Sequence, residues 1–344
     1  MEISKDTNFK INPQNKYQVN ELKYAIDALT NHESSISWAT EFENKFSNKI
    51  GSNFAIACNS GTSGLHAALF AAGVKSGDEV IIPGLTVIMD AFVVMHMGAI
   101  PIFADINIDD HLISCEEIKK KITSKTKAII TVGWDGISCD MDPIMDLANE
   151  NGIIVIDDCA RAIMNTYKGN LSGNNAHISV FSFEAKKHIT SGGEGGMIAT
   201  DDSFLAQQAR KFAGIGYKHL TADAGRTHLA QEEVQNPDYK RFDVIGLNYR
   251  MNDISAAIGI GQLERIDEII SRRIKVGKMY EELFKEFKDF KPQKIPDNCT
   301  HVYYTFSVDY QGEKISGIKW KDIYNKVKSL GGDGFYAVVA VPYL

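Results

Sequence analysis

Hydrophobic residues form short, dense runs that alternate with stretches in which apolar positions recur at helical spacing, from residue 54 onward. Short runs rich in β-branched residues are typical of buried strands, and the periodic stretches are typical of amphipathic helices. Regular alternation of the two predicts an α/β fold with a mostly parallel sheet that helices cover on both faces. Ligands of such sheets lie at the carboxyl ends of the strands.

The expected elements can be given by range. Strands are predicted at 54–58, 79–83, 100–105, 127–132, 152–158, 179–183, 195–200 and 301–310. Helices are predicted at 20–30, 38–49, 63–73, 86–98, 141–152, 201–214 and 317–332, and one or two long helices follow residue 246. Gly51 stands where a helix C-cap is expected.

The ends of the chain and one internal stretch lack this alternation. Residues 1–19 are polar and read as a loose arm, and 214–246 read as a long polar excursion near the site. Its His219, Arg226 and His228 either contact substrate or are ordinary solvated loop residues, and the second reading is simpler. We expect a large domain over 1–263 and a small α+β domain over 264–344 that looks incomplete.

A run of small residues follows the first strand of the sheet. Residues 59–64 read Asn-Ser-Gly-Thr-Ser-Gly and open a helix. Backbone N–H groups and hydroxyls at a helix N-terminus suit a phosphate, although Ser and Thr there also serve as ordinary N-caps. No GxxxxGK[ST] motif is present, so the run is not a P-loop.

Two acids, Asp157 and Asp158, end the strand predicted at 152–158. Carboxylates at the end of a buried strand are costly unless they bind a ligand, cap a helix or face water. The sequence therefore leaves two readings open, a helix cap or a partner for a cationic ligand group.

Residues 181–196 read FSFEAKKHITSGGEGG and place Lys186 and Lys187 before a glycine-rich turn. A partly desolvated lysine favours the neutral amine that attacks carbonyl groups. Paired lysines before Gly-Gly are also common in surface turns, so this stretch alone does not decide between a site and a loop.

Composition excludes several classes of partner. The net charge is −7 over 344 residues, with 37 Lys and Arg spread along the chain, which argues against nucleic acid. Five widely spaced cysteines without a CxxC pair read as reduced thiols. No apolar run approaches the length that a bilayer requires, and the first residues lack a secretion signal, so we expect a cytoplasmic protein.

Taken in order, these motifs resemble the DegT-type nucleotide-sugar aminotransferases. The resemblance covers most of the chain from about residue 20 and consists of the small-residue turn, the acid at a strand end, SFxxxK from Ser182, the Gly-Glu-Gly-Gly turn and GLNYRM. It implies pyridoxal phosphate as cofactor and the three-layer large domain of the aspartate aminotransferase fold, PLP fold type I, with a smaller C-terminal domain.

Residue roles follow from the resemblance. It implies that Lys187 joins the cofactor aldehyde covalently and that Asp158 pairs with the pyridine nitrogen, which keeps the ring an electron sink. Residues that it places around the phosphate are Gly61, Thr62, Ser63 and Ser182. Asn248 matches an asparagine that the family contributes to the neighbouring subunit, so the resemblance implies a homodimer with shared sites.

Some positions depart from the family pattern. Arg161 stands near the ring where many relatives have Gln or His, and Val87 stands where many place an aromatic residue on the ring face. His188 follows the lysine, and the turn carries an extra glycine. Relatives also continue for several tens of residues beyond Leu344, so we expect the small domain to lack strands and helices that relatives have.

The implied activity is transfer of an amino group from glutamate or glutamine to a keto-sugar nucleotide, for amino-sugar or surface-polysaccharide synthesis, with no metal. Two rivals share the fold: a sugar 3-dehydratase, whose members carry histidine at the lysine position, and a non-catalytic regulatory protein. A dinucleotide-binding enzyme is disfavoured because no GxGxxG follows the first strand.

Overall fold

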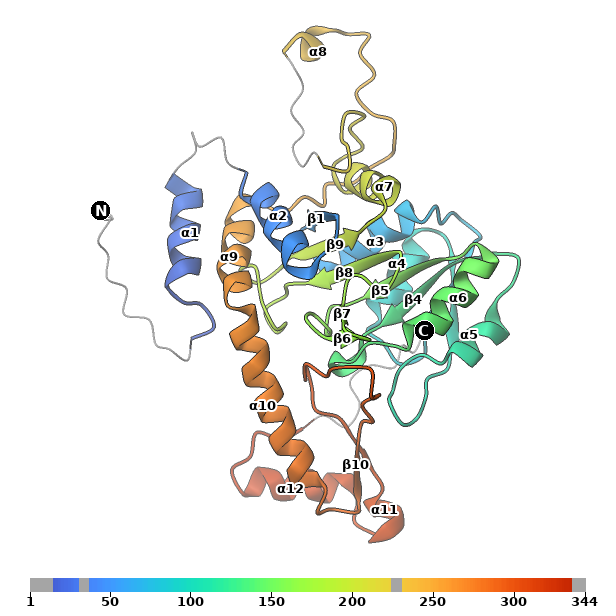
Figure 1. Cartoon of the computed structure of the whole chain (residues 1–344), viewed down its shortest axis with the longest axis vertical. Helices are drawn as coiled ribbons and strands as arrows, with labels where there is room; N and C mark the ends of the chain where they lie inside the picture. Colours follow the sequence, from blue (N-terminus) through green and yellow to red (C-terminus); the bar gives the residue numbers. More distant parts are fainter. Residues whose placement is uncertain (1–14, 31–36, 224–230, 336–344) are drawn as a thin grey trace.

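A mixed seven-stranded sheet forms the centre of the chain, with strand order β1-β9-β8-β5-β4-β2-β3 (Figure 1). The structure is a computed structural model that describes residues 15–30, 37–223 and 231–335. The strands of the sheet are β1 (Phe54–Cys58), β2 (Glu79–Pro83), β3 (Ile100–Ala104), β4 (Thr126–Val132), β5 (Ile154–Asp158), β8 (Ile178–Ser182) and β9 (Gly196–Thr200). Only β9 runs antiparallel to its neighbours, β1 and β8. The predicted mostly parallel α/β sheet is confirmed.

Side chains alternate between the two faces of this sheet and build a core on each. In β1, Ala55 and Ala57 join the core under α2 (Trp38–Ile50) and α9 (Asp253–Glu264). Ile56 points to the opposite face, into the core with α3 (Gly61–Ala71) and α7 (Ser203–Ala213). Because both faces are covered by helices, the strands are apolar on both sides, which is why they read as continuous apolar runs.

The remaining helices lie around these layers. Helix α1 (Val19–Thr30) packs along α9, and α4 (Met89–His96), α5 (Cys115–Lys121) and α6 (Met141–Asn151) follow β2, β3 and β4 in the chain (Figure 1). Helix α2 ends where predicted, because Gly51 adopts the left-handed conformation (φ 83°) and its N–H donates to the carbonyl of Ser47. The polar stretch before β8 contains a small hairpin, β6 (Thr166–Tyr167) and β7 (Asn170–Leu171).

The strand predicted at 301–310 is mostly wrong. Only Val308–Tyr310 forms a strand, β11, which pairs with β10 (Phe290–Pro292). Earlier residues instead donate to a tight turn after β4: the amide of Val302 donates to the carbonyl of Gly136 and that of Tyr304 to Asp135. Because these amides are engaged by a turn, they have no strand as partner, and sequence alternation could not reveal this.

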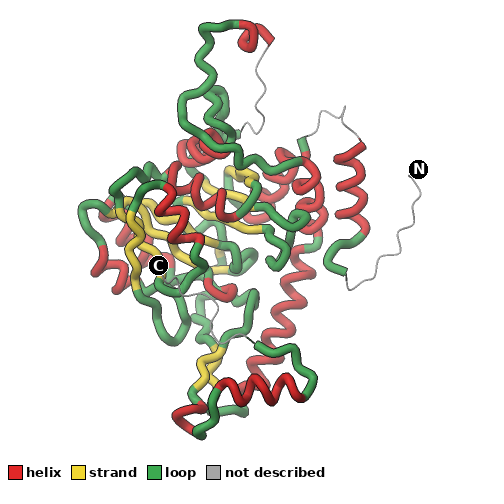
Figure 2. Tube along the Cα trace, turned by 180° about the vertical axis from the view of Figure 1, so that it is seen from behind, coloured by secondary structure: helices red, strands yellow, loops and turns green. Residues whose placement is uncertain are grey.

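The chain leaves the sheet through a long helix. Helix α10 (Ile266–Phe284) is separated from α9 by a break at Arg265 (φ −108°, ψ 8°) and runs to β10, β11, α11 (Gly312–Ile315) and α12 (Trp320–Ser329) (Figures 1 and 2). The break lies beside the predicted domain boundary at 263/264. That boundary and the small domain remain predictions.

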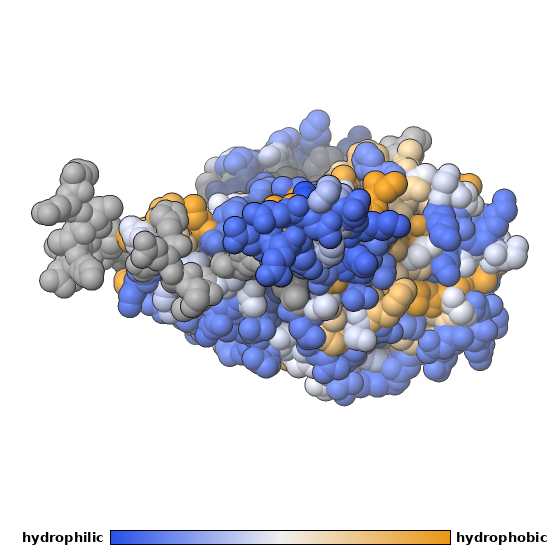
Figure 3. Space-filling view, turned by 90° about the horizontal axis from the view of Figure 1, so that it is seen from above, coloured by the Kyte–Doolittle hydropathy of each residue, from blue (hydrophilic) through white to orange (hydrophobic). Residues whose placement is uncertain are grey.

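The predicted excursion after α7 projects from the sheet as loops with the short helix α8 (Gln231–Gln235) (Figure 2). His219 is half-buried against Tyr217, with ring centroids 5.5 Å apart, so it is not a freely solvated residue. Arg226 and His228 lie outside the described residues. The face seen from this end is largely hydrophilic with smaller apolar patches (Figure 3).

Within the described ranges, no helix combines the length and apolar character needed to cross a bilayer. All five cysteines are free thiols, as predicted. Across the same ranges, no cluster of three or more His, Cys, Asp or Glu side chains is placed to hold a metal ion.

Candidate active site

Three strand ends meet at the carboxyl edge of the sheet. Asp158 ends β5, Ser182 ends the neighbouring β8, and the turn after β1 leads into α3. Gly61, the first residue of α3, lies so close to Ser182 that a Cβ added to Gly61 would be 2.8 Å from the Cβ of Ser182. The structure therefore places the small-residue turn against Ser182, although the two segments are far apart in the sequence.

Helix α3 begins with a capping box made by two serines. Ser60 is the N-cap and accepts from the amide of Ser63 at 3.0 Å, while the Ser63 hydroxyl accepts from the amide of Ser60 at 3.1 Å and bonds Asn59 Oδ1 at 2.7 Å. Both polar groups of Ser63 are thus engaged within the turn, so this residue shapes the loop, and its contact with a phosphate stays a prediction. First-turn amides of a helix have no intrahelical acceptor, so Gly61 and Thr62 keep the donors that an anion needs.

We expect Gly61→Ala to weaken phosphate binding at this turn. A methyl group at residue 61 would meet Ser182 Cβ at 2.8 Å and Oγ at 3.2 Å, and overpacking of this kind costs about 1–3 kcal/mol. Gly84→Ala is the control, since its nearest neighbour would be the Ala104 carbonyl at an ordinary 3.5 Å. Fluorescence titration with pyridoxal phosphate measures the effect, and equal affinity in the two variants would contradict it.

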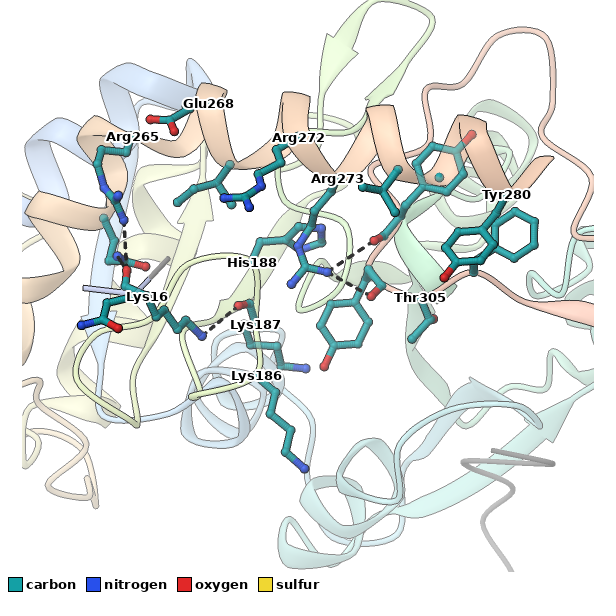
Figure 4. Close-up of a pocket in the computed structure, with 18 residues that line it drawn as sticks. Lys16, Lys186, Lys187, His188, Arg265, Glu268, Arg272, Arg273, Tyr280 and Thr305 are labelled. Atoms are coloured by element: carbon teal, nitrogen blue, oxygen red, sulfur yellow. Dashed lines mark hydrogen bonds between the residues drawn. The ribbon is translucent and has the colours of Figure 1, made fainter. Parts of the chain in front are cut away.

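The two adjacent lysines differ in environment. Lys186 is exposed, whereas Lys187 is half-buried with its Nζ 5.0 Å from the centre of the Tyr304 ring. Their side chains point in different directions (Figure 4). Burial lowers the pKa of Lys187, and the Arg161 charge lowers it further, while Asp158 acts against both. Lys187 is therefore the lysine whose amine is more readily neutral, as nucleophilic chemistry requires.

Asp158 is buried at the end of β5, and its Oδ1 accepts from the amide of Ala160 at 2.9 Å. The capping reading is therefore partly met, because one oxygen caps the following turn, and a contact of Asp158 with a cationic ligand group stays a prediction. Burial raises the pKa of Asp158, and the charges of Lys187 and Arg161 oppose that rise. A cation placed against this carboxylate would hold it ionised.

Arg161 is held in place by an aromatic ring and an acid. Its guanidinium lies 3.8 Å from the centre of the Trp134 ring, and Nη1 is 3.5 Å from Oδ1 of Asp135. Asp135 is buried and also accepts from the hydroxyls of Thr305 and Ser307. Because cation–π contact and the ion pair fix the guanidinium, Arg161 is a stationary positive charge beside the acid of β5.

Asp135 also places Tyr304 over the lysine. Its φ of 58° is in the left-handed region, and Gly136 beyond it has φ 115°. In this turn the carbonyl of Asp135 accepts from the amide of Tyr304 at 2.8 Å. A non-glycine residue at such a φ is commonly stabilised by its surroundings, here by the segment that carries Tyr304. The Gly-Trp-Asp-Gly sequence after β4 was a turn signal whose importance the sequence analysis missed.

Asp90 is a second residue that the sequence analysis missed. It lies in the first turn of α4, is completely buried, accepts from the hydroxyl of Thr86, and leaves Oδ1 without a partner. Burial raises its pKa well above the usual range, and the charge of Asp158 raises it further. The only signal in the sequence was an acid inside the apolar run TVIMDAFVV.

Two predicted site residues are more exposed than the others. Val87 is 37% exposed in the loop between β2 and α4. Asn248 is exposed, its Oδ1 accepts from Nε of Arg250 at 3.0 Å, and it lines a different hollow from Lys187. The structure therefore does not bring Asn248 to the lysine of its own chain.

A cavity of about 700 Å³ opens beside Lys187, between the loop after β8, helix α10 and residues 303–306 (Figure 4). Its lining is rich in cations, namely Lys16, Lys186, Arg265, Arg272 and Arg273, against one acid, Glu268. The carbonyl of Lys187 accepts from the Lys16 ammonium at 3.3 Å, so the start of the described chain closes one side. A cavity with this charge favours anionic ligands.

Two buried histidines predict a dependence of stability on pH. Burial lowers the pKa of His301 to about 4 and that of His188 to about 3. Both therefore stay neutral in the folded protein while their unfolded forms take up protons below pH 6.5. Each such histidine lowers the free energy of unfolding by about 1.4 kcal/mol per pH unit as pH falls from 6.5 toward 4.

We expect the free energy of unfolding of His301→Gln to fall less steeply with decreasing pH than that of the unmodified protein. Glutamine can still accept from the Tyr303 amide, which is 3.0 Å from Nδ1 of His301, but it cannot take a proton. Urea unfolding at several values between pH 7 and 4.5 measures the difference. Parallel curves for the two proteins would show that His301 is not neutralised by folding.

The residues present fit pyridoxal phosphate. The site offers a half-buried lysine for an aldehyde, a buried carboxylate for a ring nitrogen, and helix amides with two hydroxyls, Thr62 and Ser182, for a phosphate. The partnerless buried oxygen of Asp90 lies in the same charged group as Asp158 and Lys187, as expected where a ligand completes the polar contacts.

Comparisons with known proteins agree with this arrangement. The profile of the DegT/DnrJ/EryC1/StrS aminotransferase family matches residues 18–330. GDP-perosamine synthase from Caulobacter vibrioides is 40% identical over 293 residues, which are 84% of this chain and 74% of that protein. The spore coat polysaccharide biosynthesis protein SpsC from Bacillus subtilis is 33% identical over 84% of this chain and 72% of its own length.

Solved structures share the fold. An aminotransferase from Psychrobacter cryohalolentis superposes with a TM-score of 0.80 at 29% identity, over 92% of this chain and 81% of that one. A mutant of GDP-4-keto-6-deoxymannose-3-dehydratase with bound GDP-perosamine gives a TM-score of 0.80 at 25% identity, over 92% of this chain and 82% of that one. The predicted three-layer fold and the family resemblance are confirmed.

Proposed function

Because the chain belongs to the DegT/DnrJ/EryC1/StrS aminotransferase family, whose members use pyridoxal phosphate, we propose that it transfers an amino group from glutamate or glutamine to a keto-sugar nucleotide. The product would serve amino-sugar or surface-polysaccharide biosynthesis. The observation that carries the proposal is Lys187, half-buried between Asp158, Arg161 and Tyr304 at the mouth of a cationic cavity.

Each residue has an assigned task. When bound, pyridoxal phosphate supplies an aldehyde that takes up the amino group and a ring that draws electrons from the reacting carbon. Asp158 would hold the ring nitrogen, and Gly61, Thr62 and Ser182 would hold the phosphate. Lys187, as a neutral amine, removes the proton from the α-carbon of the amino donor and later delivers a proton to the sugar carbon. Val87 covers the ring with an aliphatic side chain.

The cationic cavity supports the choice of an anionic substrate. Arg272 and Arg273 on α10, together with Lys186, face a space next to the reactive lysine. Guanidinium and ammonium groups bind phosphate and carboxylate groups well. Both proposed substrates carry such groups, the diphosphate of a nucleotide sugar and the carboxylates of glutamate. A cytoplasmic location, where nucleotide sugars are made, fits this proposal and remains a prediction.

The substrate test uses one keto sugar with two possible fates. We propose GDP-4-keto-6-deoxymannose as the first acceptor, because one similar protein is named GDP-perosamine synthase and one similar structure is a dehydratase named for this sugar. With glutamate present, mass spectrometry is expected to find an amino sugar and 2-oxoglutarate. A 3-deoxy sugar with release of ammonia would instead support the dehydratase, which Lys187 disfavours because those relatives carry histidine there.

A dimer with shared sites is part of the proposal. Asn248 is exposed, and so are the apolar side chains beside it, Ile245 at 94% and Leu247 at 40%. A second copy that covers this segment would bury them and bring Asn248 to the phosphate of the other subunit. Sedimentation velocity tests for the dimer.

Mixing two inactive variants tests whether the sites are shared. In a mixed dimer of Lys187→Ala with Asn248→Asp, one site combines an intact Lys187 with an intact Asn248 from the other chain. We expect activity to return to about a quarter of the unmodified level, since half of the dimers are mixed and one of their two sites is intact. A mixture that stays inactive although mass spectrometry finds mixed dimers would contradict shared sites.

A further inference from the structure

The loop that carries Lys187 is bonded both within itself and to a segment far away in the sequence. Within the loop, the amide of Ala185 donates to the carbonyl of Gly193 at 2.9 Å, and the amide of Lys187 donates to that of Glu184 at 2.9 Å. The carbonyls of Ala185 and Lys187 in turn accept from the ammonium of Lys16 (Figure 4). Lys16 therefore contacts the backbone of the reactive lysine, although 171 positions separate the two residues.

Residues 15–21, which we call the strap, hold the backbone of Lys16 in place. The carbonyl of Lys16 accepts from Nε2 of Gln262 at 2.9 Å and from Nη2 of Arg265 at 3.0 Å. Glu21, in the first turn of α1, binds the same two side chains: Gln262 Nε2 donates to its Oε1 at 2.6 Å, and Arg265 Nη2 lies 3.1 Å from that oxygen. Because Glu21 and Gln262 are 1% and 0% exposed, these contacts are shielded from water and anchor the strap firmly.

Gln262 also connects the strap to the far end of the same loop. Its Oε1 accepts from the amide of Thr190 at 3.3 Å, while its Nε2 donates to the strap. The Thr190 hydroxyl donates to the carbonyl of Phe183 at 3.0 Å, where the loop begins. Loss of the strap would leave Nε2 of Gln262 buried without these acceptors, which is costly. The strap and the loop are therefore held together on both sides of Lys187.

The reactivity of Lys187 depends on burial, and burial depends on where its loop lies. Burial is the largest cause that lowers the pKa of Lys187. The charged groups that act on its amine are Asp158, Arg161, Glu184 and Asp90, and those that act on Lys16 are Arg273 and Glu184. A loop that moves away from its place opposite Tyr304 would expose the amine to water and raise its pKa.

We propose that Lys16 is a positioning residue for Lys187: its ammonium, anchored by the strap, holds the loop so that the reactive amine stays buried beside Tyr304. Lys16 acts through the backbone of the loop, at the carbonyls of Ala185 and Lys187. That the amine then meets a cofactor aldehyde rests on the proposed function; the hold on the loop does not.

Labelling of Lys187 with acetic anhydride in the cofactor-free protein tests this hold, because acetic anhydride reacts with the neutral amine. In Lys16→Met, the pH of half-maximal labelling, followed by mass spectrometry, is expected to rise by about half a unit, which makes the neutral fraction about threefold smaller. Lys16→Arg can still donate to both carbonyls and is expected to restore the midpoint. Lys23→Met, which removes an exposed lysine of α1, is the control and should leave it unchanged.

Equal midpoints in Lys16→Met and the unmodified protein would overturn the inference, and so would a midpoint that Lys16→Arg fails to restore. Lys16 is exposed, so we expect its variants to fold, which near-ultraviolet circular dichroism verifies.

A second variant separates the hold on the loop from the charge of Lys16. Gln262→Leu keeps every charge but removes the bridge between the strap and Thr190. We expect it to raise the midpoint as Lys16→Met does, and we expect hydrogen exchange in a peptide spanning residues 183–193 to be about threefold faster in both variants. Unchanged exchange in Lys16→Met would show that its charge alone acts and would overturn the positioning role, even if Gln262→Leu did not fold.

The experiments separate this inference from the proposed function. If labelling and exchange change as expected but no protein binds pyridoxal phosphate, the unmodified one included, the proposed function fails and the inference stands. If the unmodified protein binds pyridoxal phosphate with a visible band and the Lys16 variants label as it does, the inference is overturned and the proposed function stands.

Discussion

Replacement of Lys187 by alanine is expected to abolish the visible absorption band of cofactor joined to the protein and to reduce turnover by about 10⁴-fold, the upper end of what loss of a general base costs. The half-buried Lys187 has Asp158 and Arg161 as charged neighbours and Tyr304 5.0 Å away. These contacts supply the desolvation and the fixed charges that a reactive amine requires.

Lys186→Ala is the matched control, because it removes the same side chain one position earlier. Lys186 is exposed and its side chain points in another direction than that of Lys187 (Figure 4), so we expect the absorption band to remain and the rate at saturating substrate to change by less than about threefold. Because Lys186 lines the cationic cavity, its loss is expected to raise KM for the anionic substrates. Absorption spectra and initial rates measure both variants. Loss of the band in Lys186→Ala with its retention in Lys187→Ala would reverse the assignment.

The second large effect concerns stability. Arg210→Met is expected to lower the free energy of unfolding by about 3–5 kcal/mol, because it leaves the carboxylate of Glu43 buried without its cation. Arg210 and Glu43 are 5% and 6% exposed, and Nη1 of Arg210 lies 3.0 Å from both oxygens of Glu43. The same guanidinium donates from Nη2 to the carbonyls of Ala55 and Ala222 at 3.0 and 3.1 Å.

This pair joins α2 and α7, which cover opposite faces, around the edge strand β1 that leads into the small-residue turn before α3. The double variant Arg210→Met with Glu43→Leu removes both charges, so we expect it to recover a large part of the lost stability, although the Ala57 amide loses Glu43 Oε1 as its acceptor at 2.8 Å. Urea denaturation followed by circular dichroism compares the three proteins. A double variant less stable than Arg210→Met would show that the uncompensated charge is not the cause.

The alternation of short apolar runs with helical stretches in the sequence was sufficient to predict the central sheet. The runs at 54–58 and 79–83 coincide with β1 and β2, and Gly51 ends α2 as predicted. These elements could be found because strands covered on both faces must be apolar throughout, and because a left-handed residue after a helix favours glycine. The conformation of residues 301–307 was not predicted correctly, because their hydrogen-bond partner is the turn at Asp135 and not a strand.

The family motifs, and not the composition, indicate which of the two adjacent lysines is expected to join the cofactor. SFxxxK from Ser182 ends at Lys187, and the structure gives the physical difference, half-buried against exposed. The structure adds a local role for Ser63, whose hydroxyl and amide complete the capping box with Ser60, and its contact with the phosphate stays a prediction. A capping serine and a phosphate-binding serine look the same in sequence, so the sequence alone could not separate these roles.

The sequence by itself determined the order of strands and helices in the central sheet, the family, the cofactor that the family uses and which lysine is expected to react with it, because these follow from local periodicity and from short motifs. Only the tertiary structure decided which charges surround that lysine. Asp90, Arg161, Asp135 and Tyr304 come from four separate segments, and contacts between segments distant in sequence leave no periodic trace. Burial, which raises the pKa of Asp90 and of Asp158, exists only once those segments have packed together.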